Sequence, residues 1–355
     1  MLEEVEHWLE HRSWSAADRP LSRLLAAKRN AGAAGTVSVV LPALDEEATV
    51  GPIVETIRRE LMSEAVPLVD ELVVIDSGST DRTAEVAAAA GACVVHRDTI
   101  LPRLPAEPGK GEVLWRSLLV TSGEIVCFVD ADLRAFSASF VSGIVGPLLT
   151  EPDVQLVKAM YDRPLSEGGA LESGGNGAAA GGGARESGGN GAEQGRRLGP
   201  AEQGGRVTEL VARPLLNLHW PRLAGFVQPL GGEYAVRRSL LEQLPFPVGY
   251  GVELAMLIDA LDLAGLDALA QVDVGVRLHR HQDGQALGRM AATIYRTAQA
   301  RLARGHLVRP VLTQFDRTDE GFTPTVHDVA AEERPPMTTV PEYRARRAPT
   351  GGRVA

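Results

Sequence analysis

Residues 36–61 read TVSVVLPALDEEATVGPIVETIRREL, and residues 71–78 read ELVVIDSG. The runs TVSVVLPA and ELVVIDSG are short and apolar, as buried strands are. Between them stand apolar residues spaced three and four apart, namely Val50, Ile53, Val54, Ile57 and Leu61. This spacing predicts an amphipathic helix that buries one face. A strand, a helix and a second strand in this order predict a parallel β-α-β unit.

The same alternation continues along the chain on both sides of a glycine-rich region. We expect helices at 80–91, 110–123, 205–219, 251–265 and 286–303, and strands at 92–96, 124–132 and 268–282. Short apolar strands separated by helices are typical of a parallel sheet with helices on both faces. The sequence therefore predicts an α/β, Rossmann-like fold with a mostly parallel central sheet.

Composition divides the chain into five segments. Residues 1–35 have helical patches and form a lead-in, so we expect the ordered core to begin at Thr36. Two ordered halves follow, at 36–165 and 205–305. The tail, 306–355, is rich in Pro, Arg and Thr, and we expect it to be extended or disordered.

Residues 166–204 form the fifth segment. Between Gly168 and Gly205 lie 15 of the 38 glycines, and the heptapeptide ESGGNGA starts at both Glu172 and Glu186. Such a segment cannot bury enough apolar surface to offset the entropy that ordering would cost. We therefore expect a flexible low-complexity insert, with a glycine-rich ligand loop as the alternative.

Charge and composition exclude several classes of partner. The net charge is −10 and the isoelectric point is near 5.4, which argues against a nucleic-acid partner. No apolar run approaches the roughly 20 residues of a membrane span, and the acidic start does not resemble a secretory signal. Only Cys93 and Cys127 occur, in apolar runs where we expect them to be buried. A soluble, cytoplasmic protein is the expectation.

Polar residues follow three of the predicted strands. The first strand leads into Asp45, Glu46 and Glu47, the second into the run 76–81, and the fourth into the run 130–132. In an open parallel sheet these ends meet at one edge, where ligands bind. Ordinary helix caps are the alternative for Asp45 and for 79–81, because such residues are common there.

Asp130 and Asp132 are not explained by capping. The residues after them, LRAFSASF, do not start a helix until about Ser137. Two carboxylates two residues apart share one face of an extended chain and can hold one hard cation. Mg²⁺ suits such oxygen ligands, and Mn²⁺ is the alternative.

Two nucleotide-binding motifs fail on inspection. Lys110 in EPGKGE resembles part of a P-loop, but Leu104 stands in place of the first glycine and Gly111 in place of Ser or Thr. A G-x-G-x-x-G after the first strand is also missing, which argues against dinucleotide binding.

The second half offers basic residues at two places. Arg277, His279 and His281 alternate along a predicted strand and would share a face, either to contact phosphate or metal or as a plain polar face. Arg206 and Thr208 follow glycines at a predicted helix start, which suits anion binding or simple capping.

Together these motifs resemble a known family. They are VSVVLPALDEEATVGPIV, DELVVIDSGSTDRT, PGKGEVLWRSL, FVDADL, GGRVTELVARPLL, QPLGGEYA, GYGVE and GVRLHRH. Across 36–302 the chain resembles the actinobacterial glucosyl-3-phosphoglycerate synthases, which are retaining GT-A glycosyltransferases. The resemblance implies transfer of glucose from UDP-glucose, or from GDP-glucose, to the 2-hydroxyl of D-3-phosphoglycerate, with retention. It also implies Mg²⁺, with Mn²⁺ as the alternative, and a homodimer.

The resemblance also implies a role for individual residues. The implied nucleotide-sugar contacts are Pro42, Ala43, Leu44, Glu46, Ser77, Lys110, Asp130, Leu230 and Glu253. The implied acceptor contacts are Gly205, Arg206, Val207, Thr208 and His281. Asp132 and His279 would hold the metal, and the catalytic set would be Asp132, Glu253 and Arg277. The chain departs from the family at His281, where the family has Asn, and in the insert that ends just before Gly205.

Three competing functions remain. The first two are related transferases, a mannosyl-3-phosphoglycerate synthase and a polyprenyl-phosphate hexose transferase, of which the second would normally need membrane contact. The third is a catalytically weak nucleotide-sugar-binding scaffold. The sequence shows no well-placed carboxylate nucleophile, so our hypothesis for retention is attack on the same face as the departing phosphate. A covalent glycosyl-enzyme on Glu253 would contradict this hypothesis.

Overall fold

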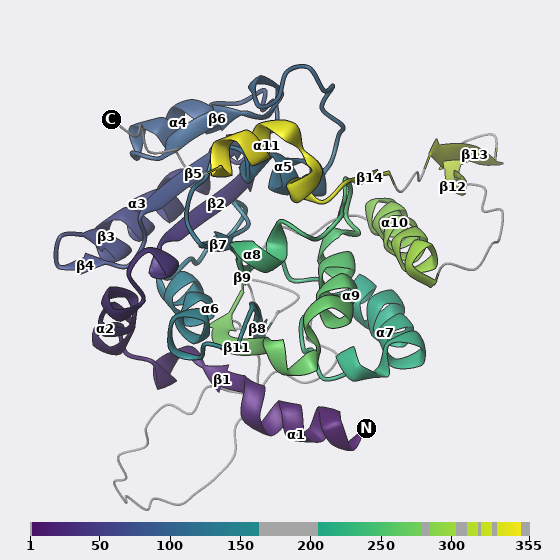
Figure 1. Ribbon diagram of the computed structural model, residues 1–355. Coiled ribbons are helices and arrows are strands. Elements are labelled where there is room, and N and C mark those ends of the chain that lie inside the picture. The colour runs from purple at the N-terminus through teal and green to yellow at the C-terminus, as the bar shows by residue number, and fades with distance from the viewer. Residues whose placement is uncertain are drawn as a thin grey trace, which may run out of the picture.

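The computed structural model describes residues 2–162, 205–277, 284–302, 311–318, 321–328 and 332–348 (Figure 1). The glycine-rich segment predicted to be a flexible insert lies outside these residues, and so do His279 and His281.

An eight-stranded mixed sheet forms the centre of the described chain, in the order β1-β11-β8-β9-β7-β2-β5-β6. Its strands are β1 (Ser13–Ser15), β2 (Val37–Ala43), β5 (Glu71–Asp76), β6 (Cys93–His96), β7 (Ile125–Phe128), β8 (Leu156–Asp162), β9 (Tyr234–Arg237) and β11 (Leu269–Val276). Every neighbouring pair is parallel except the pairs that β9 makes with β7 and β8. The prediction of a mostly parallel sheet is confirmed.

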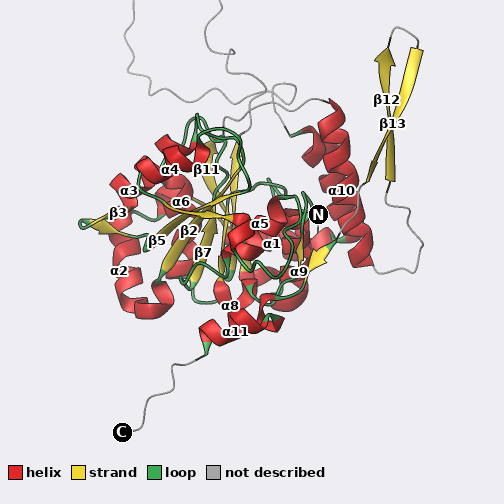
Figure 2. Ribbon diagram, turned by 90° about the horizontal axis from the view of Figure 1, so that it is seen from above, coloured by secondary structure: helices red, strands yellow, loops and turns green. Residues whose placement is uncertain are grey.

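Helices cover both faces of this sheet (Figures 1 and 2). One face packs against α2 (Leu21–Ala31), α3 (Val50–Leu61), α4 (Thr83–Ala89) and α6 (Ser139–Thr150). The other face packs against α1 (Glu3–Arg12), α5 (Lys110–Ser117), α7 (Arg213–His219), α8 (Arg238–Leu241), α9 (Val252–Ala264), α10 (Gly284–Leu302) and α11 (Pro341–Arg347). The core therefore consists of two apolar layers with the sheet between them.

The remaining strands are short or peripheral. They are β3 (Met62–Ser63), β4 (Val66–Pro67), β10 (Phe246–Pro247), β12 (Val311–Thr318), β13 (Gly321–Asp328) and β14 (Glu333–Arg334). β12 and β13 form an antiparallel hairpin that stands apart from the sheet in Figure 2. None of the helices in the described ranges is both long enough and apolar enough to cross a membrane.

The predicted β-α-β unit forms as β2, α3 and β5. The five apolar residues that predicted the helix are all fully buried. β2 and β5 pair in register from Ser38 opposite Glu71 to Ala43 opposite Asp76, so both strands end at the same level. That shared end is one edge of the sheet, and it positions the loops that follow.

β9 runs against its neighbours and brings a further loop to the same edge. Tyr234 at its start pairs with Phe128 at the end of β7 and with Lys158 on β8. Because β9 is antiparallel, the residues before Tyr234 lie beside the carboxyl ends of the parallel strands. The sequence had not predicted this strand.

The expectation that the ordered core begins at Thr36 is wrong. Val5 and Leu24 are fully buried, and the buried Trp8 donates from Nε1 to the Leu269 carbonyl at 2.7 Å. β1 pairs in parallel with β11 at the edge of the main sheet. The partners of Trp8 and of β1 are more than 250 positions away in the chain, so the local pattern could not reveal them.

The expectation of an extended or disordered tail is wrong for residues 332–348. Trp115 donates from Nε1 to the Pro335 carbonyl at 2.9 Å, and Arg334 pairs with the buried Glu112 at 2.7 Å. Tyr343 on α11 is only 2% exposed. A few large side chains therefore anchor this segment, although its overall composition predicted no ordered structure. The expected burial of Cys127 is confirmed, whereas Cys93 is exposed.

Candidate functional site

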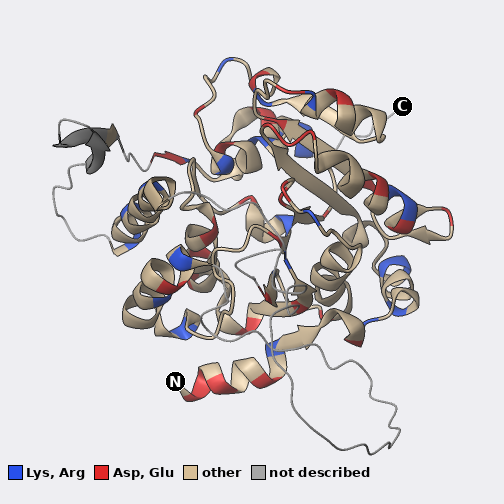
Figure 3. Ribbon diagram, turned by 180° about the vertical axis from the view of Figure 1, so that it is seen from behind, with Lys and Arg blue, Asp and Glu red and all other residues tan. Residues whose placement is uncertain are grey.

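A cavity of about 630 Å³ lies where β2, β5 and β7 end. This is the edge that the rule for open parallel sheets predicted. The volume is within the range of small-molecule sites, roughly 300–1,000 Å³. In the view of Figure 3, basic and acidic segments are interspersed along the fold rather than separated by sign.

Every residue to which the resemblance gave a site role, within the described part of the chain, lines this cavity. These residues are Pro42, Ala43, Leu44, Glu46, Ser77, Lys110, Asp130, Asp132, Gly205, Arg206, Val207, Thr208, Leu230, Glu253 and Arg277. They come from both halves of the sequence and from both sides of the insert. The structure brings them together, while the role of each residue stays a prediction.

The loops after β2 and β5 hold each other through their polar residues. Asp45 has a positive φ of 56° and accepts from the Thr80 backbone N–H at 2.7 Å, while its own N–H donates to Ser79 Oγ at 3.0 Å. The Glu47 N–H donates to Asp81 at 3.1 Å. These acids do not line the cavity, and they are not the N-caps of α3 and α4, which are Thr49 and Arg82; they bind the two loops together.

The turn before α5 explains why Lys110 stands between two glycines. Gly109 has φ of +133°, and a side chain at Gly109 or at Gly111 would overlap the backbone at 247–249. The Glu112 N–H donates to the Val248 carbonyl at 3.1 Å. The EPGKGE run is therefore a tight packing turn, and it directs Lys110 into the cavity wall.

A chain of ion pairs forms the polar centre of the cavity. Lys110 Nζ contacts Asp130 Oδ1, and it lies 2.8 Å from Glu253 Oε1. Arg277 Nη2 lies 2.6 Å from Asp130 Oδ2 and 3.2 Å from Asp132 Oδ1. One carboxylate, Asp130, thus joins two cations that come from distant parts of the chain.

Electrostatics keep both cations charged. Burial disfavours the charged form of Lys110, but Asp130 and Glu253 outweigh it and raise the pKa of Lys110 well above its usual value. Burial likewise opposes the charge on Arg277, but Glu233 and the nearby aspartates raise its pKa. The cavity therefore presents fixed positive charges beside its carboxylates.

Glu233 contacts both Arg277 and Tyr161. Its Oε1 lies 3.0 Å from Arg277 Nε, and its Oε2 accepts from the Tyr161 hydroxyl at 2.9 Å. Glu233 is fully buried, and burial raises its pKa while Arg277 opposes the shift. Glu233 thus forms an ion pair, without a hydrogen bond between Oε1 and Nε, with one edge of the guanidinium, and the other edge faces Asp130 and Asp132.

Asp130 and Asp132 fit a divalent cation. Oxygens of both carboxylates contact the same nitrogen of Arg277, so the two groups point toward one place. Oxygen ligands of this kind suit Mg²⁺ or Mn²⁺. The other predicted ligand, His279, lies outside the described residues.

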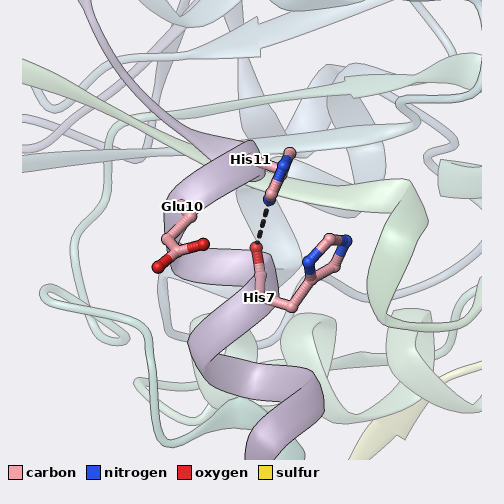
Figure 4. A group of neighbouring side chains, drawn as sticks. All are labelled: His7, Glu10 and His11. Carbon is pink, nitrogen blue, oxygen red and sulfur yellow. Dashed lines mark hydrogen bonds between the residues drawn. The ribbon is translucent and has the colours of Figure 1, made fainter.

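A separate group of metal-ligating side chains lies on α1. His7, Glu10 and His11 place one ligand atom each within 4.8 Å of one another, and all three are exposed (Figure 4). His11 Nδ1 is 2.8 Å from the His7 carbonyl oxygen, and the two rings are tilted by 30° with their centroids 4.0 Å apart. These residues do not line the cavity, so they add nothing to its chemistry.

The acceptor segment predicted around Arg206 forms the start of a helix. Gly205 has φ of +96° and accepts from the Glu209 N–H at 3.0 Å. Val207 and Thr208 are buried and Arg206 is exposed, and a π-helical turn at Thr208–Ala212 leads into α7. A basic side chain at such a helix start suits an anion.

Sequence reasoning missed several lining residues. These are Arg97, Pro108, Gly109, Val113, Ala131, Tyr250, Leu287, Met290 and Ile294. Tyr250 stands in the GYGVE motif, so a signal for it existed. Leu287, Met290 and Ile294 lie on α10, where the helical pattern was visible but the surface that it faces was not.

Comparison with known proteins gives a consistent result. A model of glycosyl transferase family 2 matches residues 38–167. The chain is 46% identical over 333 residues to glucosyl-3-phosphoglycerate synthase from Mycolicibacterium smegmatis, which covers 94% of this chain and 98% of that protein.

Solved structures agree. Glucosyl-3-phosphoglycerate synthase from Mycobacterium tuberculosis, in complex with Mn²⁺, UDP-glucose and phosphoglyceric acid, is 43% identical with a TM-score of 0.71, over 90% of this chain and 95% of that chain. The same enzyme with Mg²⁺ and UDP is 42% identical with a TM-score of 0.73, over 92% and 98%. Mannosyl-3-phosphoglycerate synthase from Rubrobacter xylanophilus is 36% identical with a TM-score of 0.79, over 94% and 99%.

Proposed function

The chain belongs to the glucosyl-3-phosphoglycerate synthase family of GT-A glycosyltransferases, and from this membership we propose the reaction that it catalyses. The enzyme transfers glucose from UDP-glucose to D-3-phosphoglycerate and releases UDP. The proposed acceptor atom is the 2-hydroxyl oxygen, GDP-glucose is a possible second donor, and the configuration at the glucose anomeric carbon is retained.

One observation supports this proposal above the others. The residues proposed for the nucleotide sugar and the residues proposed for phosphoglycerate line the same cavity, although they come from distant segments. Transfer between two substrates requires that both be held together in a fixed orientation. A scaffold that only binds a nucleotide sugar would not need the acceptor set.

The proposed donor side is formed by the ends of β2 and β5. Pro42, Ala43, Leu44, Glu46 and Ser77 would contact the uridine, and Lys110 would stand beside the diphosphate. Asp130 and Asp132 would hold Mg²⁺ or Mn²⁺, with His279 as the further ligand. Such an ion, when bound, acts as a Lewis acid that stabilises the negative charge of the departing diphosphate.

The proposed acceptor side is formed by the start of the helix at 205–208, with Arg206 as the cation for the phosphate or carboxylate of phosphoglycerate. His281, where the family has Asn, is a proposed further contact.

Leu230 and Glu253 would contact the nucleotide sugar, and Arg277 would stand near the reacting centre.

We propose that attack and departure occur on the same face of the sugar. The bond between the anomeric carbon and the phosphate oxygen breaks, the bond to the acceptor oxygen forms, and the acceptor proton passes to the departing phosphate. Glu253 Oε1 lies 2.8 Å from Lys110 Nζ. Because this oxygen is held in an ion pair, it is a poor candidate for the nucleophile. Mass spectrometry that finds glucose covalently attached to Glu253 would contradict the same-face route.

A mannosyl-3-phosphoglycerate synthase is the second candidate. The solved structure of one such enzyme has a TM-score of 0.79 with this chain, above the 0.71 of the glucosyl enzyme with UDP-glucose. Its lower sequence identity, 36% against 43%, argues the other way. The donor sugar is what separates the two candidates.

A donor screen tests the choice. Purified enzyme receives 3-phosphoglycerate and Mg²⁺ with UDP-glucose, GDP-glucose or GDP-mannose, and the phosphorylated product is measured by mass spectrometry and NMR. We expect UDP-glucose to give the highest kcat/KM and an α-linked product. A preference for GDP-mannose would favour the second candidate, and a β-linked product would exclude retention.

We further propose a homodimer in the cytoplasm. Leu210 and Leu218 are 74% and 76% exposed, and we propose that they belong to the dimer contact. The two cysteines are free, as a reducing compartment would leave them. Sedimentation velocity tests the assembly, and a species of the monomer mass, 37.7 kDa, at working concentration would contradict a dimer.

We also propose residues 36–165 as the nucleotide-sugar half and residues 205–305 as the acceptor half.

A further inference from the structure

Lys158 is a buried cation for which the proposed reaction has no assigned use. It lies on β8 between its neighbours β9 and β11, and it is 1% exposed. A lysine almost never lies this deep in a protein without a partner. Its surroundings therefore indicate what it does.

The ammonium of Lys158 has two contacts. Nζ donates to the Gly231 carbonyl, and it lies 4.8 Å from the centre of the Tyr234 ring, a cation–π distance. Tyr234 is also the direct cross-strand neighbour of Lys158. The side chain thus reaches from the centre of the sheet to the loop that precedes β9.

That loop forms part of the cavity wall. The Gly231 N–H donates to the Gln228 carbonyl at 3.1 Å, which closes a turn, and Gln228 Nε2 donates to the Tyr161 carbonyl at 3.2 Å. Within the turn, Leu230 lines the cavity. The position of the Gly231 carbonyl therefore determines where Leu230 stands.

The residue after the turn is packed against the ion pairs. A side chain added to Gly232 would overlap Lys110 Nζ and both carboxylate oxygens of Asp130. The backbone at Gly232 thus touches the two groups that connect α5 to the end of β7. Gly232 has no side chain that could reorient. A small shift of the turn would therefore displace the backbone directly relative to Lys110 and Asp130.

We propose that Lys158 is a positioning residue for the transfer reaction, which holds the turn at 228–232 against the Lys110–Asp130 pair through the Gly231 carbonyl. This inference rests on the proposed function. Lys158 does not line the cavity in which both substrates are proposed to bind, so it acts through the turn. A shift of the turn by about 1 Å is enough to lower the rate substantially, since misplacement on that scale can cost on the order of 100-fold.

Charged groups on four segments face Lys158 and set its protonation. They are Glu253 on α9, Lys110 on α5, Glu233 before β9 and Asp130 after β7. Burial, aided by Lys110, lowers the pKa of Lys158 to about 8, although the three acids oppose the shift. The ammonium is present below this pKa and is lost as the pH rises through it. A neutral amine still donates, but a charge-assisted hydrogen bond is about twice as strong.

The experiment compares Lys158→Met with a matched control. Methionine keeps the length of the side chain and removes the donor and the charge. Lys28 provides the control, because its Nζ also donates to backbone carbonyls, those of Pro67 and Leu68 at 2.9 Å, but it does not line the cavity. We measure kcat, both KM values, the pH profile of kcat and the melting temperature of Lys158→Met, Lys28→Met and wild type.

We expect Lys158→Met to remain folded and to lower kcat by about tenfold or more. Lys28→Met should keep kcat within twofold of wild type even if its melting temperature falls. The wild-type kcat should decline as the pH rises through about 8, and this decline should be missing in Lys158→Met. A purely structural lysine would lower the melting temperature and leave kcat and its pH profile unchanged.

Each remaining outcome decides the matter. The inference is wrong if Lys158→Met keeps kcat within twofold of wild type, if both variants lose kcat equally, or if the decline near pH 8 persists in Lys158→Met. If Lys158→Met does not fold, the wild-type profile decides, because a kcat that stays flat from pH 7 to 9 overturns the inference. A wild-type enzyme without transferase activity would instead refute the proposed function.

Discussion

Asp130 and Asp132 stand one residue apart but have different surroundings. Asp130 bridges Lys110 and Arg277, whereas Asp132 Oδ1 lies 3.2 Å from Arg277 Nη2 and the Asp132 side chain is 33% exposed. Asp130 is thus built into the wall, while Asp132 is better placed to exchange one partner for a metal ion. This difference supports the proposal of Asp132 as the metal ligand.

Replacing Asp132 tests that role. We expect Asp132→Ala to lower kcat at least 100-fold and to weaken Mn²⁺ binding, because the cation loses a carboxylate ligand. The half-exposed position predicts little change in melting temperature. Electron paramagnetic resonance measures bound Mn²⁺, and Asp262→Ala, an exposed acid on α9, is the control. Turnover near the wild-type rate in Asp132→Ala would disprove the metal role.

Tyr161 tests how Glu233 supports Arg277. Tyr161→Phe removes only the hydroxyl that donates to Glu233 at 2.9 Å, and it leaves a buried carboxylate oxygen without that partner. We expect a stability loss of about 1–3 kcal/mol, measured by urea denaturation, and a lower kcat because Glu233 no longer fixes Arg277. Tyr295→Phe on α10, where the ring is half exposed, should change neither quantity. Full kcat in Tyr161→Phe would show that Arg277 needs no such support.

At the scale of single residues, the motifs predicted many of the residues that line the cavity. They did not predict which of these residues form ion pairs with each other. Lys110 and Asp130 were both expected at the site, yet nothing in the sequence indicated that they pair with each other. Asp45 and Asp81 were equally compatible with a ligand site or with capping, and the structure assigns them to loop contacts. Pairing depends on three-dimensional proximity, which the spacing of residues along the chain does not contain.

The C-terminal segment, residues 332–348, contacts α5, and Lys110 is the first residue of that helix. Arg334 pairs with the buried Glu112, and Trp115 donates to the Pro335 carbonyl. α11 adds Tyr343, whose hydroxyl donates to Glu242 at 2.7 Å. This segment therefore packs across the helix whose first turn carries a site residue.

Tyr343 provides a test of that packing. We expect Tyr343→Ala to destabilise the protein by about 3 kcal/mol, because a buried aromatic side chain is lost and a cavity remains. Tyr343→Phe should cost less, about 1–2 kcal/mol, since it removes only the hydroxyl, which donates to Glu242 and accepts from Arg238. Urea denaturation followed by circular dichroism measures both values. A change below about 1 kcal/mol in Tyr343→Ala would show that α11 is not part of the core.

The helices and strands with strong periodicity were predictable, and those defined by distant partners were not. α3 and α10 were visible because many apolar residues repeat at helical spacing. β1 reads SWS and β9 reads YAVR, and neither has a run of apolar residues like the IVCF of β7. Both strands exist because they pair with strands far away in the chain, so only the tertiary structure reveals them.

For the whole molecule, the fold explains why one reaction needs residues from both halves of the chain. The parallel strands end at one edge, and the antiparallel β9 returns the chain to that same edge. Residues from both sides of the glycine-rich segment therefore line one cavity. The alternation of strands and helices predicted this edge, whereas the shape of the cavity depends on α10 and on the turn at 228–232.

Glucosyl transfer itself is the most direct test of the function. Purified enzyme with UDP-glucose, D-3-phosphoglycerate and Mg²⁺ is followed by NMR. The predicted result is one UDP released for each glucose joined in α linkage to the 2-oxygen of 3-phosphoglycerate, with no transfer when Mg²⁺ is chelated. No glucosylated phosphoglycerate, or hydrolysis of UDP-glucose at a rate independent of 3-phosphoglycerate, would contradict the proposed function.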